Sequence, residues 1–251
     1  MMSRLGEAFS RWITRGVVLR TLLVLVILIW PLVYPSSYVV RIMTTAGLYA
    51  LITMAVVVIL GQAGQLSFGH AAFYGIGAYV AGLLAMKLSF PTLAALIVGA
   101  LAAGFVAVVI GRPVLKLRYF YLALATIGLG QIFLVLVNNL RTVTGGTTGF
   151  APVPKLSVFG LVFGTAMRQY YLVWVIAVVV LLFLHRVLRG RVGRAFRALA
   201  TSEIASKALG MRTANWKLLA FVTSAVICGL AGGLYAFVNT AVTPGAFTFT
   251  S

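Results

Sequence analysis

The stretch that decides the fold is GQAGQLSFGHAAFYGIGAYVAG, residues 61–82, which sets polar side chains among closely spaced glycines. Long apolar runs flank it on both sides. In water such a segment would be an ordinary glycine-rich loop. Inside a lipid bilayer, unpaired backbone and polar side chains are costly, so the surrounding solvent determines how the stretch is interpreted.

The composition is that of a membrane protein. Hydrophobic residues make up 62% of the 251 residues, charged residues make up 9%, and the mean hydropathy is +1.10. A soluble domain has roughly 45–50% apolar and about 25% charged residues. We therefore expect an all-α, polytopic membrane protein with a single transmembrane domain over residues 1–251. The single cysteine, Cys228, lies in an apolar run and predicts neither a disulfide nor a cysteine-based metal site.

Apolar runs long enough to cross ~30 Å of hydrocarbon predict about seven transmembrane helices. The expected spans are 22–33, 42–60, 71–86, 91–110, 120–137, 170–184 and 218–238. A cleavable signal peptide is the alternative for the first run. However, no small-x-small cleavage site follows it, and Pro31 and Pro35 close it, so we expect a retained span.

Lysine and arginine indicate the orientation, because short loops rich in them stay in the cytoplasm. An N-terminus inside the cell places 15 of the 20 Lys and Arg residues on the inner side, in segments 1–20, 112–118 and 186–217. The outer side then holds Arg41, Lys87, Arg141, Lys155 and Arg168. Segment 1–20 is thus a cytoplasmic basic tail, 141–168 an extracytoplasmic loop and 186–217 a cytoplasmic loop. Topology accounts for the pI of 11.2, so nucleic-acid binding is not expected.

Chain length places part of the opening stretch at membrane depth. Residues 42–86 must form two spans of about 20 residues each, which leaves only a handful for the joint between them. Polar or irregular chain at that depth is tolerated in a protein interior or beside a water-filled cavity. The candidates for the wall of a solute path are therefore Gln62, Gln65, Ser67 and His70. Hydrogen bonds that cross-link helices are the alternative role for each of them.

Small residues recur at four-residue spacing in two expected spans, 71–86 and 218–238. The pattern includes Gly77, Ala81 and Ala85 in the first, and Ala225, Gly229 and Gly233 in the second, together with Gly232 and Ala236. Small faces let membrane helices approach closely, so we expect these two spans to pack tightly.

The segment RGRVGRAFRALATSEIASKALGMRTANWK, residues 189–217, predicts a short amphipathic helix in the cytoplasm. Thr201 is a suitable N-cap, Glu203 lies near the positive helix end, and Gly210 suits a left-handed C-terminus. One helical stripe then contains Ile204, Ala205, Ala208 and Leu209. A helix lying on anionic lipid is the alternative. The stripe is small and alanine-rich, which favours docking to a protein.

Three stretches in this order resemble the permeases of bacterial branched-chain amino acid ABC importers. They are GQAGQLSFGHAAFYGIGAY, TGGTTG after the fifth span, and GRAFRALATSEIASKALGMRTANWKLLAFVTSAVICGLAGGLYA, and the similarity covers residues 40–250. The resemblance implies that residues 201–210 form an ATPase-coupling loop. Its acid, small and glycine positions match Glu203, Ala205, Ala208 and Gly210, while Lys207 departs from the pattern. Permeases of this family continue through further glycine-rich spans beyond the position of Ser251, so the resemblance implies that this chain lacks C-terminal spans or is unusually short.

The resemblance also implies a function and partners. The chain would be a permease subunit in the bacterial inner membrane. It would move small polar solutes inward, and branched-chain amino acids are the expected substrates. Its protein partners would be a second related permease, two cytoplasmic ABC ATPases and an extracytoplasmic solute-binding protein. The chain itself would also contact membrane lipid. ATP and Mg²⁺ would bind the ATPases, so no cofactor is expected in this chain. Outer docking or gate candidates are Thr144, Gly145, Gly146 and Gly149. A permease for urea or other amides is an alternative.

Missing motifs favour a transport subunit over an enzyme. There is no G-x-x-x-x-G-K-[ST] phosphate loop, so ATP hydrolysis is expected on a partner chain. Both acids, Glu7 and Glu203, lie outside the expected spans, which leaves no Ser–His–acid set and no metal cluster. An ion-coupled secondary carrier is the alternative transport class. It needs an ionisable group within the membrane, for which His70 is the candidate. A passive channel would have no use for a cytoplasmic docking helix.

Overall fold

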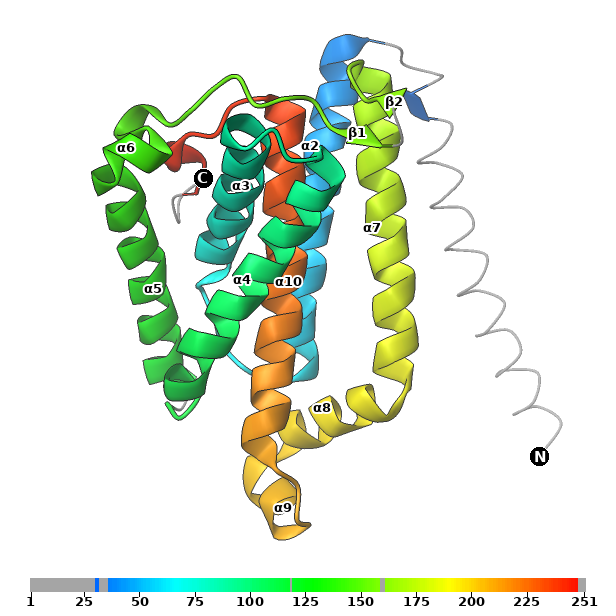
Figure 1. Cartoon of the computed structure of the whole chain (residues 1–251). Helices are drawn as coiled ribbons and strands as arrows, with labels where there is room; N and C mark the ends of the chain where they lie inside the picture. The colour runs from blue at the N-terminus through cyan, green and yellow to red at the C-terminus, as the bar shows by residue number, and fades with distance from the viewer. Residues whose placement is uncertain (1–29, 32–35, 118, 159–160, 248–251) are drawn as a thin grey trace, which may run out of the picture.

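The computed structural model describes residues 30–31, 36–117, 119–158 and 161–247. Most of these residues are helical (Figure 1). The helices are α2 (Ser37–Val56), α3 (His70–Lys87), α4 (Thr92–Val114), α5 (Tyr119–Asn139), α6 (Arg141–Thr144), α7 (Ala166–Arg189), α8 (Arg191–Thr201), α9 (Glu203–Ala208) and α10 (Thr213–Asn239). A π-helical turn, η1 (Val57–Gln62), extends α2, and two 3₁₀ turns are η2 (Gly146–Thr148) and η3 (Pro244–Phe247). Strands β1 (Ser157–Val158) and β2 (Leu161–Val162) pair antiparallel.

Five helices in the described part of the chain are long and apolar enough to cross a membrane. They are Ser37–Gln62, Thr92–Val114, Phe120–Asn139, Ala166–Arg189 and Thr213–Asn239. The expected number of about seven is therefore not confirmed. The basic tail 1–20 and nearly all of the first expected span, 22–33, lie outside the described residues. The third expected span is α3, which has 18 residues, carries His70 and Lys87 at its ends and is not among the five.

The bundle is built around α3, α4 and α10, with α5 beside α3 and α7 beside α2 (Figure 1). The small residues allow the close packing that their spacing predicts. A Cβ at Gly77 would collide with the backbone of Gly229, and a Cβ at Gly232 would collide with the carbonyl of Tyr74. The backbones of α3 and α10 thus touch directly, which a larger residue at these positions would prevent.

The outward faces of the bundle are apolar. Val175, Val179 and Leu182 are exposed on α7, and Leu101 and Phe105 are exposed on α4. Large apolar patches are rare on soluble proteins, whereas a membrane protein presents such faces to lipid or to a partner helix. The described part of the chain is thus an all-α, multi-pass membrane protein, as the composition predicts.

The two ends of the bundle differ (Figure 1). One end carries α6, η3 and the β1–β2 hairpin, whereas α8 lies across the other end with α9 beyond it. The sequence interpretation of 186–217 contains a single short helix, but the structure has two. Helix α8 buries Phe196 and Leu199 and exposes Arg191 and Arg194, an amphipathic pattern that is visible in the sequence.

Candidate solute path and coupling site

The opening stretch forms a short joint between two helices. Helix α2 continues through η1, and α3 begins at His70, which leaves residues 63–69 as irregular chain. Phe68 N donates to Thr126 Oγ1 of α5 at 3.0 Å. Gly64 has a φ of 65°, a left-handed conformation that glycine adopts without a Cβ clash. The joint is therefore a defined segment packed against neighbouring helices.

A cavity of about 510 Å³ lies beside the joint. Its lining is mainly aliphatic and aromatic, with side chains from α2, α3 and α10 such as Leu48, Tyr74 and Tyr235. Ser67 and His70, two of the predicted path residues, also border it. Its described lining contains no Lys, Arg, Asp or Glu. Such a wall is suited to a small solute with an aliphatic part and no net charge.

His70 makes a contact between helices and also borders the cavity. Its Nε2 is 2.6 Å from Ser224 Oγ of α10, a buried hydrogen bond that cross-links the helices. The same ring borders the cavity. Sequence reasoning did not identify Ser224, because it lies 154 residues from His70 and has no neighbouring motif.

The remaining polar residues of the joint have fewer partners. Ser67 Oγ is a buried atom without a hydrogen-bond partner in the described structure. Both amide atoms of Gln65 and the Oε1 of Gln62 are likewise buried and unpartnered there. Leaving a buried polar group without a hydrogen bond costs ~1–3 kcal/mol, and these atoms carry that cost in the described structure.

Gln65 does not border the large cavity but a smaller one of about 90 Å³, which Glu203 and Lys217 also line. The joint is close to α8 as well. A Cβ at Gly64 would lie 3.1 Å from the Cα of Ala200, at the end of α8. The joint thus lies between the large cavity and the segment that contains α8 and α9.

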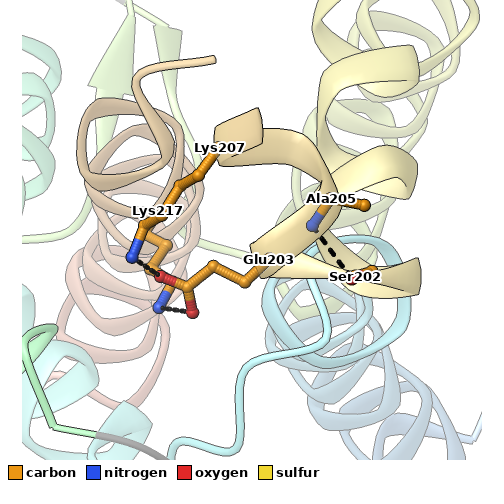
Figure 2. A network of polar contacts seen from close by, with 5 residues as sticks. All are labelled: Ser202, Glu203, Ala205, Lys207 and Lys217. Atoms are coloured by element: carbon orange, nitrogen blue, oxygen red, sulfur yellow. Dashed lines mark hydrogen bonds and ion pairs between the residues drawn. The ribbon is translucent and has the colours of Figure 1, made fainter. Parts of the chain in front are cut away.

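Helix α9 begins after an extended residue, Ser202, whose Oγ accepts a hydrogen bond from Ala205 N at 3.2 Å (Figure 2). The predicted cap, Thr201, is wrong by one position. Thr201 is the last residue of α8, and its Oγ1 donates to the Arg197 carbonyl at 2.9 Å. The predicted left-handed C-terminus is confirmed, because Gly210 has a φ of 80°.

Two lysines hold the Glu203 carboxylate (Figure 2). Lys217 Nζ of α10 donates to Oε2 at 2.6 Å, and Lys207 Nζ lies 2.9 Å from Oε1, one turn further along α9. Burial alone raises the pKa of Glu203, but the hydrogen bonds and charges of the lysines outweigh it and hold the pKa below its ordinary value. Glu203 is therefore ionised at neutral pH and ties α9 to α10.

The predicted apolar stripe of α9 faces solvent. Ile204 is 77% exposed and Leu209 is 89% exposed, and Ala205 and Ala208 are exposed as well. The stripe therefore has no apolar cover within the described residues. Glu203 points toward α10, so the acid and the exposed stripe serve different contacts (Figure 2).

The outer-loop candidates form a tight turn at the opposite end of the bundle (Figure 1). Thr144 Oγ1 is 2.6 Å from the Val137 carbonyl and 2.8 Å from that of Leu140. Positive φ angles occur at Gly145, Gly146 and Gly149. A Cβ at Gly149 would collide with the Val242 carbonyl, so the turn requires glycine there. The four residues do not border the 510 Å³ cavity.

The fold and these two sites define a multi-pass membrane protein that has a cavity lined by several of its helices and presents a short helix beyond one end of its bundle. The family model described as "Branched-chain amino acid transport system / permease component" matches residues 38–250. The chain belongs to this permease family.

Individual relatives are also named as permease proteins of branched-chain amino acid transport systems. The high-affinity branched-chain amino acid transport system permease protein LivM of Salmonella typhimurium is 34% identical over 250 residues, which cover 90% of this chain and 59% of LivM. Escherichia coli LivM is 35% identical over 243 residues, 88% of this chain and 57% of that protein. Salmonella typhimurium LivH is 27% identical over 211 residues, 76% of this chain and 67% of LivH. The chain thus spans less than three fifths of either LivM. No solved structure gives a significant match.

Proposed function

We propose that this chain is a permease subunit of an ATP-driven importer that carries branched-chain amino acids inward across the bacterial inner membrane. The single observation that carries the proposal, beside the family, is the exposed apolar stripe of α9, held outside the bundle. The partners would be two ABC ATPases that bind ATP and Mg²⁺, and an extracytoplasmic solute-binding protein. The α8–α9 end and the N-terminus would face the cytoplasm, and the TGGTTG turn would face the binding protein.

The 510 Å³ cavity would form one wall of the solute path. Its aliphatic lining suits a branched side chain, and Ser67 and His70 are polar residues that border it. Tyr49, which lines the cavity, is 56% exposed, so the cavity is open toward the outside of the bundle. A second permease would cover this side, and the similarity to both LivM and LivH supports such a pair.

Movement of the ATPases would reach the cavity by two routes. One runs from α9 through the ion pair of Glu203 and Lys217 into α10. The other runs from Ala200 at the end of α8 to Gly64 in the joint, beside which the cavity lies. In this arrangement the stripe of α9 binds the ATPase, and Glu203 transmits the movement without touching the ATPase.

Two variants separate docking from transmission. Ile204→Asp combined with Leu209→Asp places charges on the docking stripe, so the ATPase should no longer co-purify. Glu203→Lys puts three cations together in place of the ion pairs, so ATP-dependent uptake by proteoliposomes should fall at least about tenfold while membrane insertion persists. Glu7→Lys makes the same change at the other acid of the chain and is the matched control. Unchanged uptake with Glu203→Lys would refute the coupling role.

A further inference from the structure

A basic cavity of about 640 Å³ lies at the α8–α9 end of the bundle, between α4, α9 and α10. Four cationic side chains line it: Arg112, Lys116, Lys207 and Lys217. Glu203, the one acid within the described ranges, also lines it and is already paired with Lys207 and Lys217. No acid in the described part of the chain therefore balances Arg112 and Lys116. The cavity has an uncompensated positive charge.

The first turn of α10 adds to this field. Thr213 and Asn215 line the cavity, and the helix begins after Arg212 without a side-chain cap. The N-terminus of a 27-residue helix carries a partial positive charge, which favours an anion, and the side-chain amide of Asn215 can donate hydrogen bonds. The cavity therefore combines cationic side chains with hydrogen-bond donors, as phosphate recognition requires.

An exposed apolar stripe on α4 leads into this cavity. Leu101, Phe105 and Val109 are exposed and follow one another at four-residue spacing, so they lie on one side of the helix. Arg112, three residues after Val109, continues the same stripe, and Lys116 follows in the turn just beyond the end of α4. An apolar track on a membrane-spanning helix thus ends at a cationic cavity.

We propose that this cavity binds the phosphate headgroup of an anionic phospholipid, with the acyl chains of the lipid lying along the α4 stripe. Basic cavities between helices at the membrane surface attract such headgroups. The α4 stripe lies within a helix that is long and apolar enough to span a membrane, where lipid acyl chains can cover an apolar face. Inorganic phosphate could use the cations but not the stripe, so the arrangement fits an amphiphile better than a free anion. The site is separate from the exposed stripe of α9 and from the 510 Å³ cavity.

The full chain, purified in detergent, is titrated with dioleoylphosphatidylglycerol and bound lipid is counted by native mass spectrometry. Dioleoylphosphatidylcholine is the uncharged reference. We expect one retained phosphatidylglycerol at a concentration about tenfold lower than phosphatidylcholine requires. Combining Arg112→Gln with Lys116→Gln should remove this preference. Restoring charge with Arg112→Lys and Lys116→Arg should recover it, which separates a lost site from a misfolded chain.

The matched control combines Arg191→Gln with Arg194→Gln. These residues are exposed on α8 at the same end of the bundle but do not line the cavity, so the control removes equal charge while the preference should remain. Equal losses in the two double variants would mean general attraction to a basic surface and would overturn the proposal.

Two further arms test the nature of the ligand. An excess of inorganic phosphate or glycerol 3-phosphate should leave the lipid bound, and Leu101→Asn with Phe105→Asn should weaken its retention. Displacement by either free anion would show an anion site that does not need acyl chains, contrary to the proposal. If the Arg112 and Lys116 variants kept the lipid but lost a membrane or ATPase partner, the cavity would be a protein interface instead.

Discussion

Helix α10 is held by one kind of contact in its middle and by another at its N-terminal end. In the middle, Gly229 and Gly232 lie directly against the backbone of α3. At the end, Lys217 reaches a single carboxylate on α9. Backbone packing at van der Waals distance loses its energy with a shift of a fraction of an ångström. An ion pair between flexible side chains tolerates larger displacements, so the middle preserves the bundle and the end can move.

The surroundings explain why the two regions differ. Between helices in lipid there is no hydrophobic driving force, so close packing and interhelical hydrogen bonds must hold them together. Helix α9 lies beyond the bundle, where its apolar stripe is exposed. Transmission of movement from a partner would require a rigid bundle centre and a helix such as α9, which a side-chain ion pair joins to α10. Three comparisons of variants test this difference.

Gly77→Val should have the largest effect, because the new side chain would meet the backbone of Gly229, which cannot move aside. We expect destabilisation of roughly 3 kcal/mol, with a lower apparent Tm of the detergent-purified chain. Gly128→Val is the control, since a Cβ at Gly128 on α5 would have nothing within 4 Å. Similar losses of Tm in both variants would mean that the close backbone packing of α3 against α10 does not make Gly77 more sensitive to substitution than Gly128.

His70→Ala and Ser224→Ala remove the same hydrogen bond, but only His70 borders the cavity. Each should lower stability by about 1 kcal/mol, the usual value for an interhelical hydrogen bond. A wall function of His70 predicts that uptake falls further with His70→Ala than with Ser224→Ala. Equal uptake in the two variants, or loss of assembly with both, would leave His70 with a cross-linking role alone.

Lys217→Gln should have the smallest effect on global stability, because partly exposed ion pairs contribute ~0–1 kcal/mol. Its local effect should still be measurable by hydrogen exchange, with faster exchange of the α9 amides. Lys207→Gln is the matched comparison. The Lys207 side chain is 56% exposed and lies on α9 itself, whereas that of Lys217 is 14% exposed and lies on α10. If Lys207→Gln accelerated the exchange of the α9 amides as much as Lys217→Gln, the ion pair between Glu203 and Lys217 would not be the contact that stabilises α9.

Local patterns predict much of this architecture. The runs 42–60, 91–110, 120–137, 170–184 and 218–238 each correspond to a helix that can span a membrane, because apolar length is a local property. A short joint is expected from counting residues between the runs 42–60 and 71–86, and the structure has it at residues 63–69. The cap of α9 was misplaced by one residue, since Thr201 and Ser202 are chemically equivalent caps and only the backbone distinguishes them.

The pairings that build the sites could not be predicted in this way. His70 forms a hydrogen bond with Ser224, which lies 154 residues away on α10. Glu203 of α9 forms an ion pair with Lys217 of α10. Neither pair has a regular spacing, because contacts between helices depend on crossing geometry. Ser67 borders the large cavity and Gln65 borders the small one. This division of the polar joint also depends on how the helices cross.

Residue composition and order alone determine that this chain enters a membrane, where its long apolar helices run and where its polar interruption lies, because each of these follows from transfer of short segments between water and lipid. Only the tertiary structure decides that Glu203 turns toward α10 while Ile204 and Leu209 stay exposed. It also gathers Arg112 and Lys116 around one cavity with the start of α10. These outcomes depend on how helices pack in three dimensions, and one-dimensional periodicity does not carry that information.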